Sequence, residues 1–447
     1  MSEKNAITEG SIFSALWKFT LPLICAGLLQ QTYSIVDTMI VGNFIGGNAV
    51  AALGATTSIT NGASFITLGL MTGYSIQLSH LYGAGEHDKM QRLTSTAVII
   101  MSVMIVFSAV LIVVGKDFIF NVLGTPVEIR DGAAEYLDTV ALGFIFPLLY
   151  SLYSGMIRAL GDSRTTLYAL IISSLLNVVL DLLFVPVFKM GIRGAALATV
   201  IAQAVSAAYM IIYISRKMEF MRVRFKKAYM DMVLFKECIR LSLPKIFQAL
   251  AMSMGAMALQ SVNNYFGVDA VAAISTAYKI DSLSITPIMY ISSAVSIFTG
   301  QNLGAKKPER AKEGLRKGCA IAFALSLLVS ALLVFFGRDF LSLFGISQRS
   351  VELGGRFFLF CAFFYPVMGV YNAMTGFLQG LKDVAFVSFI SIFTMVIRIA
   401  VSFALRDVIG EDVIAVAECV NWTAGFFMCL IRVRGKERFL KSSGKTH

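Results

Sequence analysis

Two acidic residues lie within apolar stretches of this 447-residue chain, and they are the residues best suited to chemistry. Asp37 lies in the stretch 21–42, and Asp181 lies in the stretch 167–188. An acid at membrane depth costs about 2.5–3.5 kcal/mol on insertion scales, so such acids are rare and usually functional. The chemistry open to the pair is the binding of a proton or of a metal cation.

Asn177 and Thr199 supply two further oxygen donors. Asn177 precedes Asp181 by four residues, so both project from one face of a helix. At 1.5 Å per residue from the outer ends of their spans, Asp37, Asp181 and Thr199 fall within a turn or two of one depth. These oxygens suit a hard cation such as Na⁺, whereas two adjacent acids could instead share a proton. In a purely structural alternative, these side chains only join helices or point outward.

Other polar residues within the apolar stretches are weaker candidates. Tyr33 lies one turn below Asp37 and could hydrogen-bond to it. Gln30, Lys279 and Asp281 are candidates for the wall of a cavity, although residues 279 and 281 cannot share a helix face. Arg398 either bonds to helix carbonyls or pairs with an acid, Glu418, farther along the chain.

The composition defines the elements that must position these residues. The chain is 57% hydrophobic and 15% charged, with a mean hydropathy of +0.75, whereas soluble domains have about 25% charged residues. Repeated apolar runs of about 20 residues predict an all-α polytopic membrane protein. The twelve predicted spans are 14–41, 48–78, 93–114, 132–157, 165–188, 193–215, 241–266, 270–299, 317–336, 352–377, 385–405 and 409–431.

The placement of the basic residues predicts the topology. Most of the 38 Lys and Arg residues fall in loops and tails on one side of the predicted spans. Both termini are therefore expected in the cytoplasm by the positive-inside rule. The basic loops should contact anionic lipid of the cytoplasmic leaflet, so the net charge of +11 does not indicate a nucleic-acid partner.

The sequence also repeats itself at an offset of about 221 residues, which indicates an internal duplication. Two six-helix lobes entering from the same side predict a pseudo-two-fold axis along the membrane normal. The predicted organisation is an N-lobe at 1–215, a basic cytoplasmic linker at 216–240, a C-lobe at 241–433 and a cytoplasmic tail at 434–447. Three repeated pairs are Leu21-Pro22 with Leu243-Pro244, Gly83-Ala84 with Gly304-Ala305, and Gly115-Lys116-Asp117-Phe118 with Gly337-Arg338-Asp339-Phe340.

The second half does not repeat the acids. At the same offset Asn177 corresponds to Arg398 and Asp181 to Ser402, while Asp37 corresponds to an alanine, Ala258. The sequence therefore predicts a proton or cation site formed by this acid pair in the first lobe alone.

These features together resemble the multidrug and toxic compound extrusion (MATE) transporters, in particular the DinF-like and MepA-like prokaryotic members. The resemblance covers nearly the whole chain and includes Pro22 in span 1, the Gly83-Ala84-Gly85 end of span 2 and the turn 158–162. It implies an N-lobe cation site formed by Asp37, Asn177, Asp181 and Thr199 and completed by the carbonyl of Ala195. It also implies a bending role for Pro22. Acids typical of the NorM branch are absent from span 7, and span 10 has only Glu352.

The sequence therefore predicts a secondary antiporter rather than an enzyme. It would exchange H⁺ or Na⁺ for lipophilic, often cationic, compounds by alternating access, as a monomer in a prokaryotic inner membrane. No nucleotide fingerprint or metal-ligand spacing is present, so no cofactor is expected beyond the coupling ion. The alternatives are a lipid-linked oligosaccharide flippase of the same superfamily, whose cavity would be more basic, and an intramembrane enzyme.

Overall fold

The computed structural model describes residues 7–226 and 229–443, and this part of the chain is helical without strands. Seven of its helices are long and apolar enough to cross a membrane, or up to nine when each of two bent helix pairs counts as one span. The chain divides into two compact units. We call residues 25–240 the N-unit, and the described residues of Met1–Ile24 and Leu241–His447 the C-unit.

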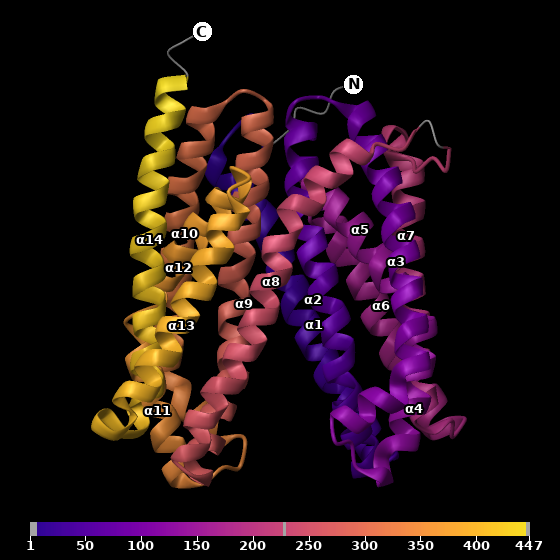
Figure 1. The fold of residues 1–447 in the computed structure, drawn as a ribbon, viewed down its shortest axis with the longest axis vertical. Helices are drawn as coiled ribbons and strands as arrows, with labels where there is room; N and C mark the ends of the chain where they lie inside the picture. Colours follow the sequence, from indigo (N-terminus) through magenta and orange to yellow (C-terminus); the bar gives the residue numbers. More distant parts are fainter. Residues whose placement is uncertain (1–6, 227–228, 444–447) are drawn as a thin grey trace. The chain divides into compact units, whose positions relative to one another are not determined.

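The N-unit contains six helical segments in sequence order when α4 and α5 are counted as one, and Figure 1 shows their arrangement. The fourth span consists of two helices that meet at a 47° bend. Its elements are α1 (Ile12–Phe44, shared with the C-unit), α2 (Gly47–Gly83), α3 (His87–Val122), α4 (Val127–Leu142), α5 (Ile145–Ala159), α6 (Arg164–Leu182) with the π turn η1 (Leu183–Val187), α7 (Gly191–Lys217) and the short η2 (Glu219–Met221).

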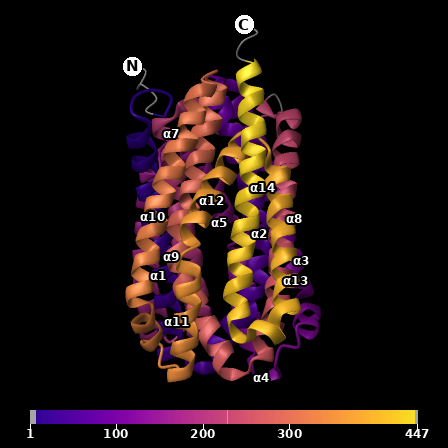
Figure 2. The same ribbon diagram turned by 90° about the vertical axis from the view of Figure 1, so that its left-hand side faces the viewer.

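The C-unit follows the same order, with a 56° bend in its fourth span. Its helices run side by side, and α11 lies at the opposite end of the unit from the C-terminal end of α14 (Figures 1 and 2). Its elements are α8 (Met232–Tyr265, shared with the N-unit), α9 (Val268–Gly304), α10 (Pro308–Ser342), α11 (Gln348–Ala362), α12 (Tyr365–Gly380), α13 (Val384–Ile409), η4 (Gly410–Asp412) and α14 (Val413–Ser443).

The element list confirms the predicted twelve-span, two-lobe helical class. When each bent pair is counted as one, each half of the described chain has six helical segments in the same order. The smaller count of seven to nine spans rests on length and apolar composition only. Corresponding helices agree in length, since α2 and α9 both have 37 residues. The opening helices α1 and α8 each contain one proline, Pro22 and Pro244. The sequence duplication is therefore a duplication of structure.

Glycines allow helices of the C-unit to approach closely. A Cβ atom on Gly376 of α12 would lie 2.2 Å from the backbone oxygen of Ser292 on α9. A Cβ atom on Gly369 would lie 2.1 Å from the Ser326 hydroxyl on α10. Lipid is as apolar as a leucine side chain, so such close contacts, rather than hydrophobic burial, hold membrane helices together.

The first turns of α1 pack in the core of the C-unit. Ile12, Leu16, Phe19 and Leu23 are buried in one cluster with residues of α9, α10, α12, α13 and α14. The predicted lobes kept this helix whole, whereas the structure divides it between the units after Ile24. The apolar face of the first turns is the physical reason, because it is buried among the C-unit helices.

Basic residues after α9 hold the segment that precedes α1. The Arg310 guanidinium donates to the carbonyls of Ile7, Glu9 and Gly10 at 2.9–3.2 Å. Lys307 donates to the carbonyl of Thr8 at 3.0 Å. The start of α1 is therefore fixed to the C-unit by hydrogen bonds as well as by apolar packing.

The basic segment between the lobes is bonded to the N-unit. Gln91 of α3 donates to the carbonyl of Arg222 at 2.8 Å. The hydroxyls of Ser95 and Thr96 accept hydrogen bonds from the backbone N–H groups of Arg224 and Asp231. These contacts explain why the residues of the predicted linker group with the N-unit.

Candidate functional site

Asp37 and Asp181 meet within the N-unit. Asp37 lies in the last third of α1, and Asp181 lies in the last turn of α6. Their carboxyl groups are within hydrogen-bonding reach of each other. The Asp181 side chain is fully buried, and that of Asp37 is partly buried. Two carboxyl groups attract each other only when a proton or another cation lies between them, because carboxylates carry acceptors and no donor.

Each acid also keeps an oxygen without a partner. Among the residues that the structure describes, Oδ1 of Asp37 and Oδ1 of Asp181 are buried and accept no hydrogen bond. A buried acceptor without a donor is costly, and a charged one more so. These oxygens are therefore suited to an ion or proton that binds transiently.

Asn177 connects the acid pair to α7. In the amide orientation that satisfies both neighbours, Nδ2 of Asn177 donates to Oδ2 of Asp181 at 2.9 Å. The amide oxygen then accepts from the backbone N–H of Thr199 at 3.1 Å, and the Thr199 hydroxyl lies 3.4 Å from the same amide. The depth argument from the sequence thus brought together side chains that the structure places in contact.

Two tyrosines complete the cluster. Tyr33 makes a side-chain hydrogen bond with Thr199 and lies close to Asp37. Tyr136 of α4 is near both acids and Tyr33, and the sequence analysis missed it. The available signal was its position four residues into the outer start of the fourth predicted span, which is the depth of the acids. Aromatic rings next to the acids reduce their access to water.

The helix that carries Asp181 changes form directly after it. The α-helix gives way to the π turn Leu183–Val187, in which Phe188 donates to the carbonyl of Leu183 at 2.9 Å. Pro186 has no N–H, so a carbonyl four or five residues earlier loses its helical donor. That carbonyl belongs to Leu182 or Asp181, at the level of the acids. Single π turns of this kind are frequent at functional sites.

The other N-unit candidates occupy different surroundings. Ala195 is buried on α7, one turn before Thr199. Gln30 is exposed on α1. Pro22 lies inside α1, which continues as one helix through it; it belongs to the part of α1 grouped with the C-unit.

The two candidates on α9 have opposite environments. Asp281 is buried and accepts a hydrogen bond from the Tyr365 hydroxyl of α12, whereas Lys279 is exposed. This agrees with their spacing, which placed them on different helix faces. Arg398 pairs with Glu418, so of the two alternatives considered the structure has the ion pair.

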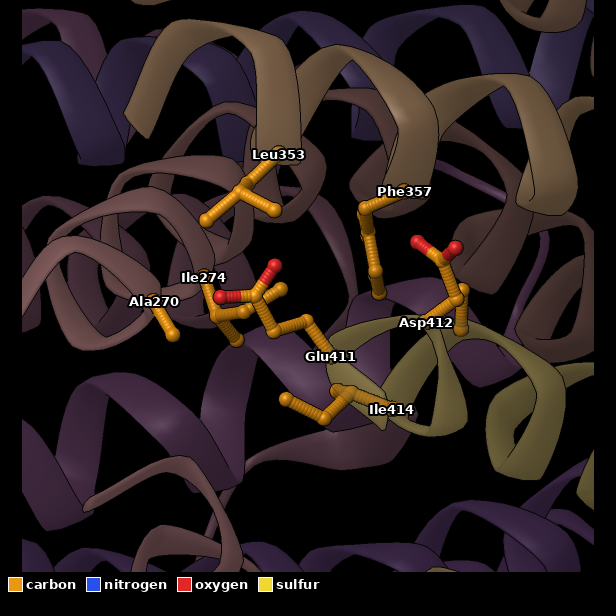
Figure 3. Close-up of a pocket in the computed structure, with 8 residues that line it drawn as sticks. Ala270, Ile274, Leu353, Phe357, Glu411, Asp412 and Ile414 are labelled. Carbon is orange, nitrogen blue, oxygen red and sulfur yellow. The ribbon is translucent and has the colours of Figure 1, made fainter. Parts of the chain in front are cut away.

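A small pocket opens at η4 of the C-unit (Figure 3). Its volume is about 10 Å³, room for roughly one water molecule. Leu353 and Phe357 line one wall, and Glu411 and Asp412 lie opposite. Both acids pair with arginines: Glu411 with Arg349 at 2.9 Å, and Asp412 with Arg356 at 3.2 Å. The pocket is therefore too small and too well paired to hold a transport substrate.

The duplicated helical fold is that of a polytopic membrane protein, and comparison with known proteins assigns its family. The MatE family model matches residues 22–183 and again residues 244–404, so the chain belongs to this family. The two matched segments correspond to the two structural repeats. Membership confirms the resemblance drawn from the sequence and makes the protein a transporter, not an enzyme.

Individual relatives cover nearly the whole chain. The chain is 26% identical to the Probable multidrug resistance protein YoeA of Bacillus subtilis (strain 168), over 98% of this chain and 97% of that protein. It is 24% identical to a protein named FAD transporter from Shewanella oneidensis, over 83% of this chain and 82% of that protein. A solved structure described as MATE in the bent conformation matches all of both chains, with a TM-score of 0.93 at 20% identity.

Proposed function

We propose that this protein is a secondary antiporter that exports lipophilic, often cationic, compounds in exchange for H⁺ or Na⁺. Entry of the ion from outside would occupy the cluster of Asp37, Asn177, Asp181 and Thr199. The observation that carries the proposal is the contact of a fully buried acid, Asp181, with a partly buried one, Asp37, without a cation beside them among the described residues. An ion drives a conformational change only through different affinities for the two states.

The same cluster supports either coupling ion. For a proton, the two carboxyl groups would share it, as two acids at close range do. For Na⁺, the ligands would be carboxylate, amide, hydroxyl and carbonyl oxygens, the donors that hard cations prefer. The Ala195 carbonyl fits the second case, because the N–H of Thr199, its helical donor, also bonds to Asn177. A shared donor leaves that carbonyl freer to bind an ion.

The substrate class is proposed from the relatives and the composition. One relative is named as a multidrug resistance protein, and a chain with 35 Phe and 21 Met residues can supply adaptable apolar and aromatic contacts. A second relative is named for FAD, which is anionic. The charge of the substrate is therefore part of the test. We further propose a monomer in the inner membrane with both termini in the cytoplasm.

The test is efflux from proteoliposomes containing the purified protein. A fluorescent lipophilic cation and FAD are loaded separately, and a pH gradient and a Na⁺ gradient are imposed one at a time. Efflux of the cation driven by one of the gradients supports the proposal. Efflux of FAD alone would overturn the substrate class, and a rate independent of both gradients would overturn antiport.

Variants locate the ion site. Asp37→Asn and Asp181→Asn should each abolish gradient-driven efflux, because each removes one carboxyl of the pair. Glu135→Gln is the matched control: Glu135 is an exposed acid on α4, one residue from Tyr136. If both asparagine variants keep gradient-driven efflux at the level of the control, the site assignment fails even though the family assignment stands.

A further inference from the structure

The C-unit contains a second buried polar cluster, built from different residues. Asp281 on α9, Arg398 on α13 and Glu418 on α14 provide its charges. Taken as whole residues, Asp281 and Glu418 are 6% and 9% exposed, low values for acids in apolar helices. Burying a charge is costly unless it is paired, so the charges of this cluster have to be accounted for together.

Arg398 is paired with Glu418. Its guanidinium forms an ion pair with the Glu418 carboxylate and donates to the Tyr278 hydroxyl at 2.7 Å. The two side chains are only 11% and 12% exposed. The positive charge of Arg398 and the negative charge of Glu418 therefore cancel. One further acid remains in the cluster.

That further acid is Asp281. Its Oδ1 accepts from the hydroxyl of Tyr365, whose side chain is fully buried. Among the described residues no Lys, Arg or His forms an ion pair with it, although Lys279 is only two residues away. Lys279 is exposed on another face of α9, so it does not neutralise Asp281. The cluster therefore has two carboxyl groups and a single guanidinium, which is paired with Glu418.

We propose that Asp281 is a proton-binding site of the C-unit, separate from the acid pair of the N-unit. A proton on Asp281 makes the cluster neutral, and its departure leaves one negative charge in an apolar surrounding. Such a charge is costly at membrane depth, where intramembrane acids commonly serve proton relays. The titratable and charged groups that face Asp281 are Tyr278 on α9, Cys361 on α11, Tyr365 on α12, Arg398 on α13 and Glu418 on α14.

The chain carries a natural reporter for this site. The ring centroids of Trp422 and Tyr365 lie 5.3 Å apart, so Trp422 contacts the residue that hydrogen-bonds to Asp281. The sequence has two tryptophans, Trp17 and Trp422. The substitution Trp17→Phe leaves Trp422 as the single indole fluorophore, whose emission responds to charge and hydrogen bonding around Tyr365.

The experiment is a pH titration of tryptophan fluorescence in the full-length Trp17→Phe protein in detergent. We expect a single transition between about pH 5 and pH 9, the range between the ordinary titrations of Asp and Tyr. Adding Asp281→Asn should remove it, and adding Asp281→Glu should restore a transition. Absence of any transition in the Trp17→Phe protein, or its survival unchanged in Asp281→Asn, would overturn the proposal.

Two controls separate this site from the first one and from misfolding. Asp181→Asn in the same background should leave the transition in place, because that residue belongs to the N-unit. The assignment of Asp281 can therefore hold whether or not the proposed antiport does. Should Asp281→Asn fail to fold, as judged by size exclusion, infrared spectra of the Trp17→Phe protein decide instead. A protonated-carboxyl band that titrates with the fluorescence, and shifts in Asp281→Glu, supports the site; a band that does neither contradicts it.

Discussion

The N-unit and the C-unit use one helical order but balance their buried charges differently. In the N-unit, Asp37 and Asp181 contact each other, and no cation is among their described neighbours. In the C-unit, the residue equivalent to Asn177 in the repeat is Arg398, which pairs with Glu418. The N-unit thus has no cation of its own for either acid, whereas the C-unit neutralises one of its acids, Glu418, with a cation attached to its own chain.

The largest expected effect comes from breaking the attached pair. Glu418→Gln should destabilise the protein by about 3–5 kcal/mol, because it leaves the Arg398 guanidinium buried and unpaired. Thermal unfolding in detergent measures the loss. The double variant Arg398→Met, Glu418→Leu is the control and should recover most of the stability, since it removes both charges. If Glu418→Gln unfolds at the same temperature as the parent protein, the ion pair of Arg398 and Glu418 does not stabilise the C-unit.

A second variant gives the N-unit a buried guanidinium like that of Arg398 in the C-unit. Asn177→Arg places a guanidinium beside the acid pair, where it should replace the mobile ion. The apparent affinity for the coupling ion should then fall by about 5–150-fold, the range that a coupling free energy of 1–3 kcal/mol covers. Efflux rates in proteoliposomes measure this, with Asn177→Gln as the matched polar control. Ion-driven efflux at the parent rate in Asn177→Arg would show that the acids do not carry the coupling.

The smallest effect is expected from a single hydroxyl. Thr199→Val keeps the shape of the side chain and removes its oxygen, a hydrogen bond worth about 0.5–1.5 kcal/mol. If the ion is Na⁺, the Na⁺ concentration for half-maximal efflux should rise by a few fold, because one ligand is lost. If the ion is a proton, efflux should keep its parent dependence on the gradient. The comparison of the two gradients in this variant therefore distinguishes the coupling ions.

Much of the fold follows from apolar run length. The predicted span 165–188 lies within one residue of the helix and π turn at Arg164–Val187. The predicted span 93–114 is much shorter than α3, His87–Val122, because the helix continues through polar residues beyond the apolar run. The bend within 132–157 was not predicted. It falls at Gly143, where an added Cβ atom would lie 2.5 Å from the Val200 side chain, a contact between segments distant in sequence.

The sequence predicted the common depth of the candidate site residues in the membrane, but not the contacts between helices. Counting residues from span ends gave a common level for Asp37, Asp181 and Thr199, and the structure brings their surroundings together. The same counting does not say which helices are neighbours. It therefore left the partner of Arg398 open and gave no hint that Tyr365 bonds to Asp281. Such contacts depend on how helices are arranged around one another, which hydropathy does not encode.

The packing of the first turns of α1 has a consequence for biosynthesis. These turns are synthesised before the C-unit helices that bury Leu16 and Phe19, which begin after residue 241. At about 5–20 residues per second, more than 200 residues of synthesis take roughly 10–40 s. During that interval the start of α1 has only lipid or an insertion partner to cover it. The C-unit can therefore be completed only after the N-unit has already been made, when the first turns of α1 pack against the later helices.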